Sequence, residues 1–284
     1  MKHMRNFAPV CVGLCFALAA STEAVHECRP ISGVHELWSK PGLRFVLVGE
    51  IHGTTEAPAI FRDLVCSTRS LHRPVVVGIE RPSDEQEALD AFLASEDHAG
   101  AVRTLLSEKG WNTLDGRSSR AMLLLLEELR ELKLKKLVSE VVVFDQSRSG
   151  ESAAQRENYM ASALTAAAAR HTRSLVVALT GNLHASKKPM AKFGSYPFMA
   201  MLLPQAETLS LFISDQGGEA WTQTSDGCGP HKLNSTGGEH RGVFLSAGLA
   251  PLPGYDGVLS TGLVSSPSFP AIGDPPPQPA CSKE

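Results

Sequence analysis

Acidic and imidazole side chains recur directly after short apolar runs of this sequence. One run is followed by Glu50 and His52, and another is followed by Asn182 and His184. Imidazole nitrogens and carboxylates serve proteins as general acids and bases and as ligands of divalent metals. The recurrence therefore indicates a catalytic or ligand-binding site.

Two further apolar runs also end in charged residues. One leads into Glu80 and Arg81, and another leads into Asp145. Glu50 and Glu80 could shift the pKa values of the histidines or assist them in proton transfer. Arg81 could stabilise an oxyanion. We expect Asp145 and Asn182 to contact a bound cofactor.

The elements that must position these residues alternate between strand and helix. Short apolar runs that end in polar residues predict strands buried on both faces, and the intervening segments have helical spacing. This alternation predicts an α/β fold with a mostly parallel sheet, helices on both faces and a mixed or antiparallel C-terminal portion. The carboxyl ends of parallel strands share one sheet edge, so the charged groups should meet there. The expected strands are 44–49, 75–79, 141–144 and 175–179, and the expected helices are 57–69, 83–93, 118–137 and 153–170.

The C-terminal third has a different character. Residues 208–214 and 220–224 are expected as later, antiparallel strands, and the glycine-rich segment 226–242 as a loop. A short helix at 197–203 and a closing strand within 255–263 complete the single domain, 25–264. The proline-rich segment 265–284 is expected to be a disordered or surface-draped tail. Upstream, Ser83 and Gln86 have the spacing of a capping box at a helix start.

Each charged group also has an ordinary structural interpretation. A histidine after a strand more often makes a structural hydrogen bond than binds a ligand, and a Glu–Arg pair is commonly a local ion pair. An aspartate such as Asp145 after a strand often caps the element that follows. Clustering several charges is nevertheless costly unless they pair or bind something, which favours a functional site.

The N-terminal segment has the pattern of a secretory signal. Basic residues at positions 2–5 precede the uncharged stretch 7–20, and small residues favour cleavage after Ala19 or Ala24. This stretch of 14 residues is short for a membrane span, which needs about 20. We expect residues 1–24 to be removed and the mature protein to be secreted or periplasmic, with no transmembrane span; a retained anchor is the alternative.

Composition limits the partners and the covalent links. The net charge of −3 gives no electrostatic case for binding nucleic acid or an anionic membrane surface. The exported chain would keep four cysteines, which permits two disulfides in an oxidising compartment. We expect Cys28 to pair with Cys66 and Cys228 with Cys281, and free thiols are the alternative.

Two elements carry a family resemblance. The segments Gly49-Glu50-Ile51-His52 and Gly181-Asn182-Leu183-His184 resemble the paired signatures of the superfamily that contains erythromycin esterases, ChaN-like haem-uptake proteins and Tiki/TraB proteins. The likeness spans residues 44–203 and is closest to the ChaN-like and Tiki type. It implies a parallel-sheet fold with two histidines facing each other across a cleft, but not one activity, because members of the superfamily differ.

The resemblance and the residues together favour an exported hydrolase that cleaves an ester, amide or peptide bond in a small molecule or peptide. In one version, Glu50, His52 and His184 hold a divalent metal, and a free carboxylate acts as general base. In a metal-free version, His52 is the base and Glu50 orients it. One alternative is a haem- or metal-binding uptake protein without catalysis, and another is an inactive interaction module. The sequence lacks the further histidine typical of ChaN-like members, and His52 is one residue closer to its glutamate than the base of erythromycin esterases.

Overall fold

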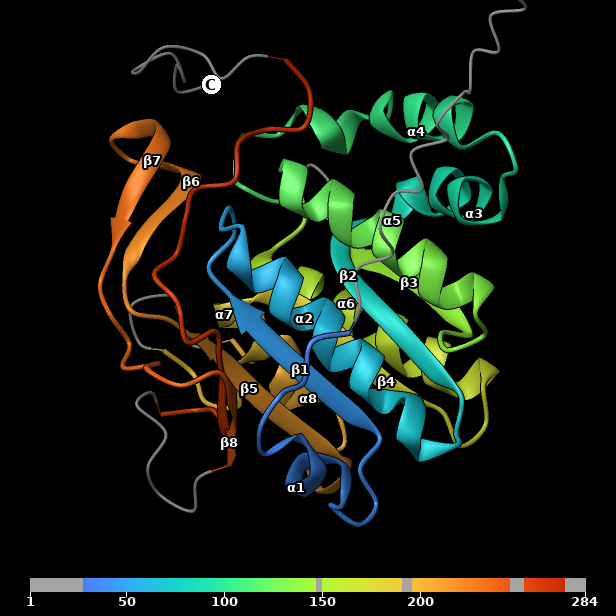
Figure 1. Ribbon diagram of the computed structural model, residues 1–284, viewed down its shortest axis with the longest axis vertical. Helices are drawn as coiled ribbons and strands as arrows, with labels where there is room; N and C mark the ends of the chain where they lie inside the picture. The colour runs from blue at the N-terminus through green and yellow to red at the C-terminus, as the bar shows by residue number, and fades with distance from the viewer. Residues whose placement is uncertain (1–27, 147–149, 191–195, 246–252, 274–284) are drawn as a thin grey trace, which may run out of the picture.

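A seven-stranded sheet forms the centre of the molecule. The computed structural model describes residues 28–146, 150–190, 196–245 and 253–273. The strand order is β3-β2-β4-β1-β5-β9-β8, and every neighbouring pair is parallel except β8 with β9. The mostly parallel α/β architecture is confirmed (Figure 1). The strands are β1 (Phe45–Glu50), β2 (Val75–Pro82), β3 (Glu140–Asp145), β4 (Leu175–Gly181), β5 (Thr208–Ser214), β8 (Gly242–Leu245) and β9 (Gly257–Ser260).

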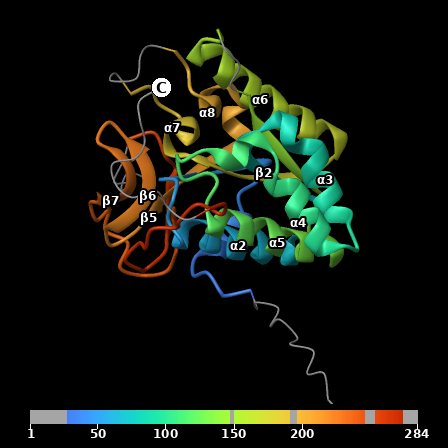
Figure 2. The same cartoon turned by 90° about the horizontal axis from the view of Figure 1, so that it is seen from above.

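Helices cover both faces of the sheet, as Figure 2 shows from above. One apolar layer lies under α2 (Glu56–Ser67), α3 (Gln86–Ala94) and α5 (Arg120–Leu134), and the other under α6 (Ala153–Arg170) and α8 (Met199–Leu202). Every residue of β1 and β4 is buried, as expected for strands between two helical layers. Three further helices are α1 (Val34–Trp38), α4 (His98–Leu106) and α7 (Asn182–Ala185).

Two expectations for the C-terminal third are wrong. β5 runs parallel to β1, because the chain between β4 and β5 crosses back before β5 begins. Residues 226–242 are not a loop throughout, since β7 (Gly227–Leu233) pairs antiparallel with β6 (Gly218–Thr224) in a separate hairpin. β7 contains two glycines and a proline, which obscure the side-chain pattern of a strand, so its pairing partner decides its structure.

The expected capping box at Ser83 is also wrong. Residues Ser83–Glu85 form a 3-10 turn, and Ser83 caps nothing. The Gln86 side chain instead reaches β3: its Nε2 donates to the Val141 carbonyl at 3.0 Å, and its Oε1 accepts from the Val143 amide at 2.9 Å. Because β3 is the edge strand, Gln86 satisfies backbone groups that no neighbouring strand pairs.

The first part of the proline-rich segment is ordered against the domain. Residues 265–273 run from the β6–β7 hairpin past the start of α2 to the start of α5 (Figure 1), with bridges at Gly218, Thr54 and Ser119. Ser265 and Ser268 are buried there. Of the two expected forms, the surface-draped one describes 265–273, whereas 274–284 lie outside the described residues. Within the described ranges, no helix has the length and apolar character needed to cross a membrane.

The N-terminal segment is tied to α2 by a disulfide. The predicted bond between Cys28 and Cys66 is confirmed, with the two Cα atoms 5.9 Å apart. Cys228 is also disulfide-bonded, but its predicted partner, Cys281, lies outside the described residues. The predicted signal segment, 1–24, lies outside them as well.

Removing the Cys28–Cys66 disulfide should cost measurable stability. The bond closes a loop with a sequence separation of 38 residues, which restricts the unfolded chain. We expect Cys28→Ser combined with Cys66→Ser to lower the free energy of unfolding by about 2–4 kcal/mol in denaturant titrations. The exposed change Ser70→Ala is the control. A loss below about 0.5 kcal/mol, the usual range of surface substitutions, would contradict this expectation.

Candidate active site

His52 lies between two buried carboxylates at the end of β1. Its Nδ1 is 2.9 Å from Glu50 Oε1, and its Nε2 is 3.6 Å from Glu80 Oε2. The turn that carries His52 is anchored at Gly53, whose carbonyl accepts hydrogen bonds from the amides of Trp221 and Ser268. Gly53 has φ of +90°, and a Cβ there would collide with the Trp221 backbone, so only glycine permits this close approach. The β6–β7 hairpin and residues 265–273 therefore fix the His52 turn.

His184 has the same arrangement on the other side of the site. It lies on α7, immediately after β4, and its Nδ1 is 2.8 Å from Glu157 Oε1 on α6. Its Nε2 is 3.6 Å from Glu80 Oε1. The second oxygen of Glu157 accepts a hydrogen bond from the Met199 amide at 2.7 Å, which fixes the carboxylate. Both imidazoles thus have one nitrogen bound to a buried carboxylate and the other directed at Glu80.

Glu80 is the centre of the cluster. It is 3% exposed, and its Oε2 accepts hydrogen bonds from Thr180 Oγ1 at 2.7 Å and the Gly181 amide at 2.5 Å. Its Oε1 forms ion pairs with Arg117 at 3.4 Å and Arg156 at 3.0 Å. Separations of 3.6 Å to the histidines are too long for direct hydrogen bonds, so both Nε2 atoms keep their capacity for a ligand.

The backbone of β4 explains why these groups can meet. β4 lies between β2 and β1, and Gly181 at its end is in register with Glu50. A Cβ on Gly181 would lie 2.9 Å from His52 Nε2, 3.4 Å from Glu80 Oε2 and 3.6 Å from a ring carbon of His184. The missing side chain therefore leaves the space in which the two rings and the carboxylate approach one another.

Charge in the cluster is strongly coupled. Burial disfavours a charged His52, but the carboxylates of Glu80 and Glu50 outweigh burial and raise the pKa of His52 to about 10. Burial acts in the opposite sense on Glu80, yet its neighbours His184, His52 and Arg117 hold the pKa of Glu80 well below its usual range. Burial raises the pKa of Glu50, whose Oε2 has no hydrogen-bond partner among the described residues. At neutral pH, His52 is thus an imidazolium facing an ionised Glu80.

The structure does not bring Arg81 to the histidines. Its guanidinium donates to both oxygens of Glu85, at 2.7 and 2.9 Å, and stacks 3.9 Å from the ring centre of Trp111. Successive side chains of a strand point to opposite faces, so Glu80 and Arg81 cannot both face the cluster. The expected role of Arg81 in stabilising an oxyanion is therefore wrong. Arg81 also donates a hydrogen bond to the Arg117 carbonyl at 2.8 Å, which helps to hold the loop that carries Arg117.

Asp145 and Asn182 lie at the expected sheet edge but have local partners. Asp145 accepts hydrogen bonds from Arg117 at 2.6 Å and from Arg156 at 2.7 and 2.8 Å. The backbone carbonyl of Asn182 accepts a hydrogen bond from the Tyr255 hydroxyl. Asp145 thus positions the two guanidinium groups that contact Glu80. Cofactor binding by Asp145 and Asn182 stays a prediction.

Three charged residues of the site were missed by the sequence analysis. Arg117 lies in the loop before α5, and Arg156 and Glu157 lie in the second turn of α6. None of them follows a strand, so the strand-end pattern could not select them. The only sequence signal was the position of α6 directly after β3, which brings its first turns to the same edge of the sheet.

The proposed metal ligands do not converge. Glu50 binds the Nδ1 of His52, whereas the Nε2 atom, on the opposite edge of the ring, is directed at Glu80. The remaining central carboxylate, Glu80, is occupied by two arginines, a hydroxyl and an amide. Within the described parts of the chain, no group of three or more His, Cys, Asp or Glu side chains has a metal-holding arrangement. These residues, as arranged, do not fit the metal site expected from Glu50, His52 and His184.

Comparisons with solved structures identify the fold. The sequence matches no protein-family model and no curated protein. A mutant of the erythromycin esterase EreC in its open conformation superposes with a TM-score of 0.62 at 10% identity, covering 80% of this chain and 92% of that one. A succinoglycan biosynthesis protein superposes with a TM-score of 0.59, also at 10% identity, over 87% and 94% of the two chains. The chain therefore has an erythromycin esterase-like fold, and the expected closeness to the ChaN-like and Tiki type stays a prediction.

Proposed function

We propose that this protein is a hydrolase that cleaves an ester, amide or peptide bond with two imidazole–carboxylate pairs, Glu50–His52 and Glu157–His184. One observation carries the proposal. Each pair binds its imidazole through Nδ1 and directs Nε2 toward an oxygen of the shared carboxylate Glu80, which lies beside Gly181. A carboxylate that holds a histidine in this way is the orienting group of many catalytic acids and bases. The erythromycin esterase-like fold adds support by analogy.

The two histidines would have different tasks. His184 Nε2 accepts a proton from water as the water oxygen attacks the carbonyl carbon, while Glu157 stabilises the resulting imidazolium. His52, already an imidazolium, stabilises the negative charge that develops on the carbonyl oxygen. When the tetrahedral intermediate collapses, the bond to the leaving group breaks and the proton on His184 passes to that group. The products are a carboxylic acid and an alcohol or amine.

The arginines and Glu80 would set the electrostatics of this reaction. Glu80 stays ionised and keeps His52 protonated, because its own negative charge is stabilised by Arg117, Arg156 and the Gly181 amide. A fixed charge pattern of this kind needs no reorganisation during the reaction. The two arginines therefore contribute indirectly, by holding Glu80.

A substrate panel tests the proposal. Purified protein is incubated with p-nitrophenyl esters, anilides and short peptides, with and without exhaustive chelation. The expected result is turnover that survives chelation and falls about 1,000-fold in His184→Gln. His171→Gln is the matched control, because His171 forms an imidazole–carboxylate pair with Glu140 at 2.8 Å away from the site. No turnover of any substrate, or equal turnover in the two variants, would refute the proposal.

Two alternatives have direct tests of their own. Metal assistance stays a prediction, and loss of turnover on chelation would support it. Haem binding without catalysis also stays a prediction, and a Soret band shift on titration with haem would support it. Export is part of the proposal and rests on the predicted signal segment, and the Cys28–Cys66 disulfide supports it because such bonds persist in oxidising compartments.

Adding one methyl group at Gly181 should disturb the site without unfolding it. A Cβ there would lie 2.9 Å from His52 Nε2, closer than side-chain contacts allow, and the ring would have to move. Displacement of a catalytic group by about 1 Å can cost about 100-fold in rate. We therefore expect Gly181→Ala to lower kcat/KM by about 100-fold with a Tm close to that of the wild type. Ser70→Ala, an exposed change away from the site, is the control. Undiminished activity of Gly181→Ala would show that the space beside Gly181 is not used.

A further inference from the structure

A cavity lies outside the histidine cluster, on the α2 and α5 side of the sheet. It has a volume of about 530 Å³, within the range of ligand pockets, and shares no residue with the histidine cluster. Its walls come from α2, the first nine residues of α5, the N-terminal segment, Arg241 before β8 and the segment 261–269. Two of the elements that form it are therefore the disulfide-bonded segment and the proline-rich segment.

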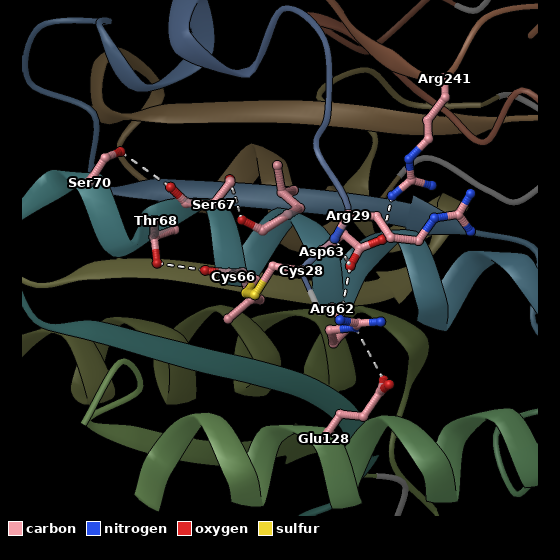
Figure 3. The surroundings of a disulfide bond; sticks show 12 residues. Cys28, Arg29, Arg62, Asp63, Cys66, Ser67, Thr68, Ser70, Glu128 and Arg241 are labelled. Atoms are coloured by element: carbon pink, nitrogen blue, oxygen red, sulfur yellow. Dashed lines mark hydrogen bonds and ion pairs between the residues drawn. A yellow bond between two sulfur atoms is a disulfide. The ribbon is translucent and has the colours of Figure 1, made fainter. Parts of the chain in front are cut away.

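Four arginines line this cavity: Arg29, Arg62, Arg120 and Arg241. The three acidic residues of the lining are already engaged. Asp63 accepts from the Arg29 amide and Arg62 Nη1, both at 3.1 Å, and from Arg241 (Figure 3). Glu128 pairs with Arg62 Nε at 3.4 Å, and Glu56 accepts from the Ser266 amide at 2.8 Å.

Arg29 and Arg120 place positive charge at the rim of the cavity. Within the described ranges, no hydrogen bond or ion pair involves the guanidinium of the exposed Arg29, and that of Arg120 donates only from Nε, to the Pro270 carbonyl at 3.3 Å. Burial lowers the pKa of Arg241, and the nearby charges of Arg29 and Arg62 lower it further, although Asp63 opposes them. Cations crowded in this way favour binding of an anion.

The other side of the lining is apolar and solvent-accessible. Leu124, Leu263 and Phe269 are 46%, 47% and 37% exposed, and Ala59, Ala121 and Pro267 lie beside them. Exposed apolar side chains that gather at a cavity commonly mark a binding site. Charge and apolar surface thus face the same space, which matches a ligand with an acidic group and a hydrocarbon body.

We propose that this cavity binds an organic acid with an apolar body, such as a medium-chain fatty carboxylate. The carboxylate lies between Arg29 and Arg120, and the hydrocarbon chain lies against Leu124, Leu263 and Phe269. The disulfide links Cys28, the residue before Arg29, to Cys66 on α2. This covalent bond therefore helps to position the Arg29 guanidinium that binds the anion (Figure 3). This inference is independent of the proposed hydrolase activity.

Calorimetric titration with decanoate, below its critical micelle concentration, tests the proposal on the full mature chain. We expect saturable binding at one site, at least tenfold tighter than that of decanol, which lacks the charge, and of acetate, which lacks the chain. Arg29→Gln combined with Arg120→Gln should weaken decanoate binding about tenfold, since each arginine loses a charge-assisted hydrogen bond. Arg69→Gln combined with Arg103→Gln, at two exposed arginines that do not line the cavity, is the charge-matched control.

A second pair of variants tests the apolar wall. Leu124→Ser should weaken decanoate binding about threefold or more through lost apolar contact, whereas Leu134→Ser, an exposed leucine on the same helix outside the cavity, should not. Thermal melts confirm that each variant is folded. Absence of saturable decanoate binding, equal affinity for decanoate and decanol, or wild-type affinity in the double arginine variant would each overturn the proposal.

Discussion

Glu80→Gln is expected to lower the free energy of unfolding by about 3–5 kcal/mol, the usual cost of removing one partner from a buried ion cluster. Glu80 is the carboxylate that His52, His184, Arg117 and Arg156 share, and all four lie within 3.6 Å of its oxygens. Glutamine has nearly the same shape but no charge. The variant therefore isolates the electrostatic contribution of this residue, which denaturant titration at pH 7 measures.

The control and the pH dependence sharpen this prediction. Glu140→Gln removes a partly exposed carboxylate that pairs with Arg170 and His171, and it should cost about 1 kcal/mol or less. Because the pKa of Glu80 is lowered in the folded state, its contribution is fully present above about pH 4.5 and is lost as the pH falls below that value. The difference between the wild type and Glu80→Gln should therefore shrink in acid. A cost no larger than that of Glu140→Gln would show that Glu80 is not the centre of the cluster.

His52→Gln is expected to lower kcat/KM about 1,000-fold on the best substrate of the panel. Glutamine can keep a hydrogen bond to Glu50 but cannot carry the positive charge that would stabilise the oxyanion. The loss should appear mainly in kcat, because the charge acts on the transition state rather than on substrate binding. His171→Gln again provides the control.

The pH profile separates two roles for His52. If the imidazolium is the working form, activity of the wild type continues through neutral pH and falls as the pH rises through about 10, where His52 loses its proton. If neutral His52 acts instead as the base, activity rises toward that pH. A rise that continues to pH 10 would contradict the assignment of His52 as the charged group and of His184 as the base.

The sequence predicted the sheet edge correctly because strand ends carry a local signal. Apolar runs that end in Glu50, Glu80 and Asp145 can be recognised from neighbouring residues alone, and parallel pairing then places them together. The sequence also placed His52 and His184 on the same edge, and both lie 3.6 Å from Glu80. The parallel order of the strands therefore brings residues that are far apart in sequence into one cluster.

The remaining features depend on contacts that no local pattern encodes. Arg81 follows Glu80, yet strand alternation turns it toward Glu85 and Trp111. Glu157 on α6 lies among many exposed helical positions, and only the packing of α6 on the sheet directs it at His184. The direction of β5 depends on its pairing with β1, and two glycines and a proline obscure the strand pattern of β7. Tertiary contacts decide each of these outcomes.

The most direct test of the central claim is an NMR titration of imidazole nitrogen-15 and carbon-bound proton shifts, with His52→Gln used to assign the resonances. The claim is that a buried Glu80, supported by Glu50, holds His52 as an imidazolium at the shared edge of β1, β2 and β4. We expect His52 to remain protonated through neutral pH and to titrate near 10, and its pKa to move down toward 6.5 in Glu80→Gln. Titration of His52 near 6.5 in the wild-type protein would contradict it.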